Sequence, residues 1–241
     1  MIDLIIVKDY EEASDRAFEV MKEFLQPGKV LGLATGSTPL GLYARMVRDH
    51  EENGTSYEEI RSFNLDEYVG LPIDHPESYH AFMKRNLFDH IDIREENTHV
   101  PSGLGEDLEA QAKAYDEMID AAPVDIQLLG IGSDGHIAFN EPGTPFDSGT
   151  HVTDLAESTI RDNCRFFDND ISKVPTQAVT QGIGTIMKAR NILLIATGAN
   201  KAQAVKDMLE GEISEDCPAS VLQRHPHVTV IADEAAASLL K

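Results

Sequence analysis

The chain has 241 residues, of which 41% are hydrophobic and 26% charged, and its formal net charge at pH 7 is −22. This composition is ordinary for a globular protein, and the length suits one large α/β domain or two small ones. A strongly negative surface repels phosphate, which disfavours nucleic acids and anionic membranes as partners. An anionic ligand must therefore be attracted by a few local donors.

Short apolar segments alternate with longer segments of helical period along the whole chain. In chain order, we predict strand 3–7, helix 11–25, strand 30–34, helix 39–52, strand 61–65, helix 77–88, helix 107–121, strand 124–131, helix 177–188, strand 191–196, helix 201–209 and strand 228–232. Several strands are apolar almost throughout, as in sheets that are covered on both faces. The alternation indicates a single α/β domain, doubly wound around a mostly parallel sheet with helices on both faces.

The first twelve residues contain a short apolar run without a basic leader or a small-residue cleavage site, so we expect no signal peptide. No apolar stretch approaches the roughly 20 residues that a membrane-spanning helix needs. The two cysteines, Cys164 and Cys217, lie in unrelated contexts without metal-ligand spacing, which favours a reducing compartment. We therefore expect a cytoplasmic protein, whereas its oligomeric state, monomer or small homo-oligomer, is left open.

In such a sheet the active site lies beyond the carboxyl ends of the strands, and three strand ends carry polar motifs. The first is Thr35-Gly36-Ser37-Thr38-Pro39, after strand 30–34. Gly36 permits close backbone approach, and Thr38 is placed to cap a helix that begins with Pro39. A helix N-terminus with added hydroxyl donors binds phosphate, although an ordinary strand–helix turn uses the same residues.

The second motif consists of two adjacent acids, Asp66 and Glu67, which follow strand 61–65 and precede Tyr68. Burial among apolar neighbours raises the pKa of such a carboxyl toward a value that is useful for a general base. A helix-capping acid or a solvated loop acid is the alternative interpretation.

The third motif delivers Asp134, His136 and Glu141 after the longest apolar strand. In an extended stretch, Asp134 and His136 project to the same side, and a helical turn before Pro142 would bring Glu141 back toward them. A histidine beside carboxylates suits proton transfer between hydroxyl groups. A metal site or a structural histidine is the alternative, but no further ligand cluster is evident, so we expect no metal.

Five segments, taken together and in this order, resemble the glucosamine-6-phosphate deaminase family: residues 35–39, 64–71, 134–142, 165–170 and 198–201. The similarity extends from about residue 30 to about residue 233. It implies a Rossmann-like fold and catalysis without a metal or an organic cofactor. It also implies a small sugar phosphate as the partner, with glucosamine 6-phosphate and water converted to fructose 6-phosphate and ammonia in amino-sugar catabolism.

The resemblance also implies roles for individual residues. Asp66 would move a proton between C1 and C2 of the open-chain sugar. Asp134, His136 and Glu141 would form the ring-opening group, with His136 acting on the ring oxygen and the anomeric oxygen. The phosphate would be held by Gly36, Ser37, Thr38, Arg165 and Lys201.

Residues 143–175 have a weak period and contain several glycines and prolines, so we predict a mobile lid, which the family also has. Larger, regulated relatives carry basic residues just after the catalytic glutamate. Residues 144–154 of this chain contain no lysine or arginine. We therefore predict an enzyme without allosteric regulation.

Two other functions share this architecture. A 6-phosphogluconolactonase would need a base for water but no group to move a C2 proton, and residues 65–68 and 134–141 resemble the deaminase more closely. A sugar-phosphate sensor in a transcription regulator would lose the catalytic acids and carry a DNA-binding segment. This chain retains the acids and has no basic patch, so the deaminase is the favoured interpretation.

Overall fold

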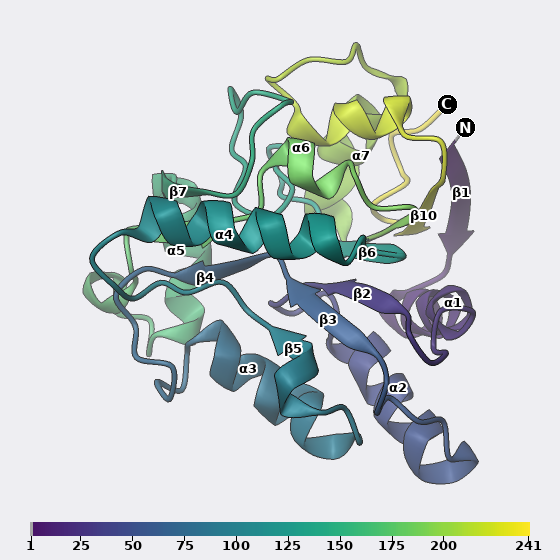
Figure 1. Ribbon diagram of the computed structural model, residues 1–241. Coiled ribbons are helices and arrows are strands. Elements are labelled where there is room, and N and C mark those ends of the chain that lie inside the picture. Colours follow the sequence, from purple (N-terminus) through teal and green to yellow (C-terminus); the bar gives the residue numbers. More distant parts are fainter. Residues whose placement is uncertain (1) are drawn as a thin grey trace.

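The computed structural model describes residues 2–241, and its centre is a parallel sheet of seven strands (Figure 1). Their order across the sheet is β1-β10-β9-β6-β2-β3-β5, and every neighbouring pair is parallel. The strands are β1 (Ile2–Val7), β2 (Val30–Leu33), β3 (Arg61–Asn64), β5 (Thr98–His99), β6 (Ile126–Leu129), β9 (Ile192–Ala196) and β10 (Val228–Asp233). The predicted fold class is confirmed, and all six predicted strands belong to this sheet.

The sheet is wound in two directions from its middle. The chain moves from β2 to β3 to β5 on one side, and from β6 to β9 to β10 on the other. Right-handed crossovers in opposite directions place their helices on opposite faces of the sheet, and Figure 1 shows α4 lying across one face. The α-helices are α1 (Tyr10–Lys22), α2 (Leu40–Asn53), α3 (Tyr79–Asn86), α4 (Leu108–Ala121), α5 (Glu157–Asn163), α6 (Ile183–Ile186) and α7 (Ala202–Glu210).

Short 3₁₀ segments complete the connections between these elements. They are η1 (Phe88–His90), η2 (Glu95–Asn97), η3 (Cys164–Phe166), η4 (Ile171–Lys173), η5 (Ala199–Lys201) and η6 (Pro218–Arg224). Five of the six predicted helices are found within a few residues of their predicted ends.

The central strands are buried on both faces, which explains their nearly continuous apolar sequence. All residues of β2, β6 and β9 are buried. On β3, the ring of Phe63 packs between Tyr115 of α4, at 5.8 Å, and His99 of β5, at 4.7 Å between ring centroids. Burial of a side chain of this size stabilises the fold by about 1.5–3 kcal/mol, so these strands form a rigid platform.

A second, antiparallel sheet was not expected from the sequence. It contains β4 (Asp66–Tyr68), β8 (Gln177–Thr180) and β7 (His151–Asp154), in the order β4-β8-β7. The predicted helix 177–188 is wrong, because its first part is β8 and only α6 is helical. Gly182 and Gly184 interrupt the helical pattern, and a Cβ atom on Gly182 would lie 2.1 Å from the carbonyl oxygen of Ser148.

Residues 143–175 are more regular than their sequence indicates. They contain β7, α5, η3 and η4, which the weak period of their sequence does not indicate. These elements are short, and they cover a small apolar cluster that is separate from the main core. The cluster contains Tyr68, Phe139, Leu155, Phe167, Val174 and Ala178.

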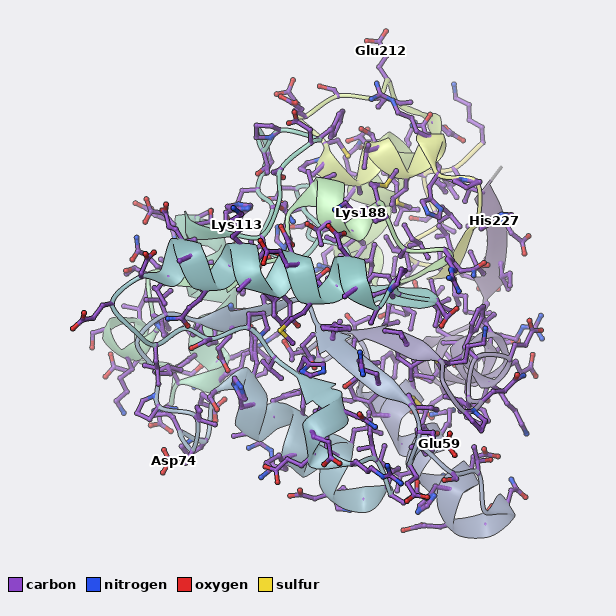
Figure 2. All side chains as sticks on the ribbon, viewed as in Figure 1. Glu59, Asp74, Lys113, Lys188, Glu212 and His227 are labelled. Carbon is purple, nitrogen blue, oxygen red and sulfur yellow. The ribbon has the colours of Figure 1, made fainter. Side chains whose placement is uncertain are left out.

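Acidic side chains such as Glu59, Asp74 and Glu212 project from the periphery of the molecule (Figure 2). The net charge of −22 is therefore carried largely by a solvated surface. None of the helices in residues 2–241 has the length and apolar character that crossing a membrane would require.

Candidate active site

A cavity of about 1200 Å³ opens where the winding of the sheet reverses, between the carboxyl ends of β2 and β6. Ligands of doubly wound proteins bind at such a switch point. Seven of the nine residues predicted for the site line this cavity: Gly36, Ser37, Thr38, Asp66, His136, Arg165 and Lys201. The other two, Asp134 and Glu141, contact His136. The structure therefore brings all nine residues together.

The loop after β2 offers unpaired backbone donors to the cavity. Gly36 has a φ of 85°, a conformation that favours glycine. Among residues 2–241, no acceptor contacts the backbone N–H groups of Gly36, Ser37 and Thr38. The expectation that Thr38 caps the helix was wrong, because Pro39 is the N-cap of α2 and its own side chain makes no capping hydrogen bond. The three free N–H groups suit an anion.

Tyr10, at the start of α1, fixes this loop from the far side. Its hydroxyl lies 3.0 Å from the carbonyl oxygen of Ser37 and 3.2 Å from that of Thr38. The same hydroxyl accepts a hydrogen bond of 2.8 Å from the N–H of Gly41, in the first turn of α2. Tyr10 thus provides the cap that the sequence assigned to Thr38. Because its partners are 27 to 31 residues away in the chain, no local signal reveals it.

Two cations face the cavity from other elements. Arg165 lies on η3, and Lys201 ends η5, which follows β9. Neither forms an ion pair with another part of the chain within residues 2–241. Burial lowers the pKa of Lys201; the charges of Asp162 and Asp134 oppose this fall, and that of Arg165 adds to it. The two unpaired cations provide local attraction for an anion inside an acidic envelope.

Asp66 opens β4 and is buried beside the cavity, with 7% of its surface exposed. Burial raises the pKa of its carboxyl to about 8; the negative charge of Glu67 adds to the rise, and the positive charge of His136 opposes it. A carboxylate with a pKa near the working pH is well suited to remove a proton from carbon. The alternative of a solvated or capping acid does not fit Asp66.

Glu67, the neighbouring acid, has a different environment because successive residues of a strand face opposite sides. Its buried carboxylate accepts hydrogen bonds from the N–H groups of Tyr79, at 2.9 Å, and His80, at 3.1 Å. The ring of His80 also contacts it, at 2.8 Å between Nδ1 and Oε2. Glu67 therefore holds the N-terminus of α3, and only Asp66 is free for chemistry.

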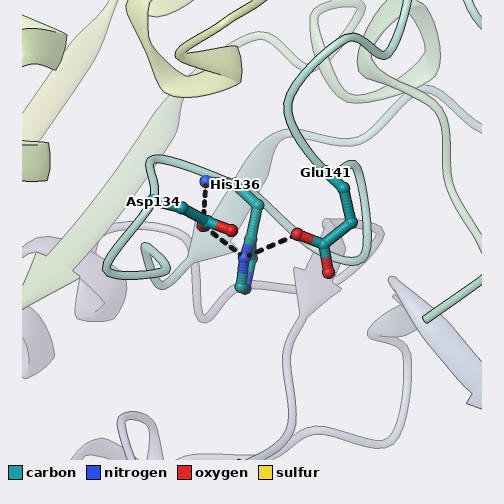
Figure 3. Close-up of side chains that lie close together, drawn as sticks. All are labelled: Asp134, His136 and Glu141. Carbon is teal, nitrogen blue, oxygen red and sulfur yellow. Dashed lines mark hydrogen bonds and ion pairs between the residues drawn. The ribbon is translucent and has the colours of Figure 1, made fainter. Parts of the chain in front are cut away.

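His136 lies between two carboxylates (Figure 3). Its Nδ1 is 2.7 Å from Asp134 Oδ1 and 3.3 Å from Glu141 Oε2. Burial alone would lower the pKa of His136, but the two carboxylates raise it to about 9. The ion pair with His136 in turn holds the pKa of Asp134 well below its usual range. Because both acids contact Nδ1, the other ring nitrogen is left for a ligand in the cavity.

The loop that carries these three residues differs from the predicted conformation. Asp134 and His136 meet across a turn, not along an extended stretch, since Gly135 has a φ of 86° and the N–H of Gly132 donates to the carbonyl oxygen of His136 at 2.9 Å. Glu141 returns without a helical turn. A tight turn between Ile137 and Asn140, with Ala138 at a φ of 51°, brings it back instead.

Sequence reasoning missed a further polar residue at this site, Thr159 of α5. Its hydroxyl donates a hydrogen bond of 2.6 Å to Glu141 Oε1, on the side of the carboxylate away from His136. Thr159 is nearly buried, lines the cavity and comes from the segment predicted to be a lid. A single threonine 18 residues after Glu141 carries no sequence signal of its own.

The ligand atoms of Asp134, His136 and Glu141 lie within 4.8 Å of one another, and no other such group occurs in the described residues 2–241. These three side chains are therefore the candidate metal ligands of the chain. A metal would have to displace the proton that the two carboxylates hold on His136, because only the neutral ring binds metals. The donor set thus favours a proton over a metal near neutral pH.

Comparisons with known proteins show the family to which the chain belongs. The family model described as "Glucosamine-6-phosphate isomerases/6-phosphogluconolactonase" matches residues 10–231. The glucosamine-6-phosphate deaminase of Shouchella clausii is 52% identical over 241 residues, which cover 99% of this chain and 97% of that protein. The deaminase of Corynebacterium kroppenstedtii is 50% identical over 241 residues, covering 100% and 93%.

Solved structures give the same answer for the fold. A monomeric glucosamine-6-phosphate deaminase superposes with a TM-score of 0.96 at 46% identity, covering 98% of this chain and 99% of that one. The 6-phosphogluconolactonase of Trypanosoma cruzi superposes with a TM-score of 0.79 at 23% identity, covering 100% and 97%, which shows a shared fold. From its family model, its relatives and its site, this chain belongs to the family of glucosamine-6-phosphate isomerases and 6-phosphogluconolactonases.

Proposed function

We propose that the chain is a glucosamine-6-phosphate deaminase, which converts glucosamine 6-phosphate and water to fructose 6-phosphate and ammonia. One observation carries the proposal: a buried carboxyl group, Asp66, shares a cavity with a histidine, His136, that lies between two carboxylates. Isomerisation of an aldose needs a base at carbon and an acid–base group at oxygen, and these two side chains provide them. Hydrolysis of a lactone would need no base for a C2 proton.

Ring opening is the task of His136 with Asp134 and Glu141. The bond between C1 and the ring oxygen breaks, the ring oxygen gains a proton, and the anomeric hydroxyl loses one as C1 becomes a carbonyl. His136 can give one proton and take the other, because the two carboxylates stabilise its charged form and fix the ring. General acid–base catalysis of this kind contributes about 10²–10⁴-fold to the rate.

Asp66 then acts on the open chain. It removes the proton from C2 while the C1 oxygen is protonated, which gives an enol-amine. Return of the proton to C1 gives a ketose with an imine at C2, water adds to that carbon, and ammonia leaves. The buried position of Asp66 keeps its carboxylate poorly solvated and therefore basic.

The phosphate is held at the other end of the cavity by the free N–H groups of Gly36, Ser37 and Thr38, together with Arg165 and Lys201. Backbone donors and cations bind phosphate by charge-assisted hydrogen bonds. Binding energy from this remote group positions C1 and C2 against Asp66. Since all of these groups belong to one chain, we infer that one copy suffices for the reaction.

We also place the enzyme in the cytoplasm, on the support of its two free thiols, Cys164 and Cys217, which fit a reducing compartment. The segment 143–175 remains our proposed lid. Arg165 of this segment lines the cavity, so closure of the segment over a bound sugar phosphate would bring its guanidinium onto the phosphate.

The reaction is tested by following ammonia and fructose 6-phosphate together from metal-stripped protein and glucosamine 6-phosphate. We expect the two products in equal amounts. Hydrolysis of 6-phosphogluconolactone, with neither product from the amino sugar, would contradict the assignment and support the lactonase. Binding of sugar phosphates without turnover of either substrate would support a sensor.

The pH dependence of kcat/KM is expected to be bell-shaped, with its maximum between about pH 8 and 9. Asp66 must be deprotonated, so activity rises with pH through its pKa of about 8. His136 must be protonated to act on the ring oxygen, so activity falls as pH rises through its pKa of about 9. Initial rates at subsaturating substrate between pH 6 and 10 measure both limbs. A maximum near pH 6 would exclude this assignment of protonation states.

We expect no allosteric activation. The stretch that follows Glu141 in the chain, residues 144–154, has no lysine or arginine to hold an anionic effector. The rate of ammonia release should therefore depend hyperbolically on glucosamine 6-phosphate, with or without N-acetylglucosamine 6-phosphate. A sigmoidal curve that the acetylated sugar phosphate straightens would overturn this prediction.

A further inference from the structure

We infer that Thr159 is a positioning residue for ring opening, which holds the carboxylate of Glu141 against His136; this inference rests on the proposed function. Two atoms of Glu141 have separate partners. Oε1 accepts the hydroxyl of Thr159 at 2.6 Å, and Oε2 lies 3.3 Å from His136 Nδ1. Oε2 is buried and accepts no hydrogen bond within residues 2–241, so its position depends on the ion pair with His136 and on the bond that fixes Oε1. With Oε1 fixed, rotation of the carboxylate away from His136 would cost the Thr159 bond.

The helix that carries Thr159, α5, has contacts to two other parts of the site and is followed directly by Arg165. The side-chain amide of Asn163, on α5, donates a hydrogen bond of 2.8 Å to the hydroxyl of Tyr68. Tyr68 is the last residue of β4, and Asp66 is the first. Arg165 follows directly on η3 and lines the cavity. One short stretch thus touches the ring-opening group, the strand of the base and the proposed phosphate site.

The environment of Thr159 makes its hydroxyl specific for this role. Only 6% of its surface is exposed, and its neighbour Ser158 faces solvent. Burial of a hydroxyl group without a hydrogen bond destabilises the folded state. The hydroxyl of Thr159 avoids this loss by its hydrogen bond to Glu141. Valine has the same shape as threonine without the hydroxyl, so Thr159→Val removes the hydrogen bond and leaves the packing.

The test compares Thr159→Val, Thr159→Ser and the control Ser158→Ala, which deletes an exposed hydroxyl from the same helix. For Thr159→Val we expect kcat on glucosamine 6-phosphate to fall about tenfold. Losses of this size are typical when a hydrogen bond that orients a functional side chain is removed. KM should change by less than about twofold, since no contact to the phosphate is lost. Thr159→Ser should restore most of kcat, and Ser158→Ala should behave as the wild type.

A second readout does not depend on turnover. Without Thr159, Glu141 is free to turn away from His136, so the pKa of His136 measured by NMR should fall in Thr159→Val and return in Thr159→Ser. An unchanged pKa of His136 together with an unchanged kcat would overturn the inference. Loss of thermal stability alone, with kcat and the pKa of His136 retained, would assign Thr159 a structural role and overturn it as well. If wild type releases no ammonia, the proposed function fails, and the NMR titration still decides the position of Glu141.

Discussion

Replacement of Asp66 by asparagine is expected to lower kcat by about 10²–10⁴-fold, which is the range that general base catalysis contributes. The amide has the shape of the carboxylate but cannot accept a proton from C2. The phosphate site is untouched, so inorganic phosphate should inhibit the variant and the wild type with the same constant. Asp74→Asn is the matched control, because it makes the same carboxyl-to-amide change at an exposed position on the periphery of the molecule (Figure 2).

The same variant should be more stable than the wild type at alkaline pH. The folded pKa of Asp66 is about 8, raised from 3.8, so the folded state binds more protons than the unfolded state between these values. Stability then falls as pH rises through this window. Asparagine does not ionise, and the Tm of Asp66→Asn should exceed that of the wild type by about 2 °C or more at pH 9. An inactive variant with a lower Tm at pH 9 would show that Asp66 is a structural residue.

Replacement of His136 by glutamine is the second large effect, with an expected fall in kcat of about 10²–10⁴-fold. Glutamine can donate to the two carboxylates but cannot transfer a proton to the ring oxygen. The loss of charge also leaves Asp134 and Glu141 close together without a cation between them. His227→Gln is the control, since His227 is exposed at the edge of the molecule (Figure 2) and precedes β10, whose opposite end, Asp233, lines the cavity.

An isotope effect separates the roles of His136 and Asp66. If His136 serves ring opening, that step becomes rate-limiting in His136→Gln, and deuterium at C2 of glucosamine 6-phosphate should no longer slow the reaction. The ratio of rates for the two isotopes should approach 1 in this variant. A larger ratio than in the wild type would mean that His136 takes part in the transfer of the C2 proton, and would contradict the division of labour proposed here.

The parallel sheet could be predicted from the sequence because its central strands β2, β6 and β9 are apolar and buried on both faces, and because amphipathic helices alternate with the strands. The motifs at the strand ends locate the cavity. The small antiparallel sheet could not be predicted in the same way. β4 begins with two acids, whose place in a strand depends on tertiary pairing with β8.

The residues of the candidate site also fall into a group that the sequence indicates and a group that it does not. Residues that follow a strand directly, such as Asp66 and His136, are marked by their position in the chain. Residues that support them from a distance, such as Tyr10 and Thr159, are not, because their importance comes from one hydrogen bond across the fold. The conformation of the loop around His136 also depended on positive φ angles that a residue pattern does not specify.

The single residue between β3 and β4 has a consequence for anyone who engineers this enzyme. Leu65 is held at both of its backbone groups, donating to Leu33 at 3.1 Å and accepting from Gln181 at 2.7 Å. A shift of one position in β4 would exchange the two acids, pointing Glu67 at the substrate and Asp66 at the helix. The length of the connection between β3 and β4 therefore decides which of the two acids faces the cavity. Libraries that vary residue identity here should yield active clones far more often than libraries that insert or delete a codon.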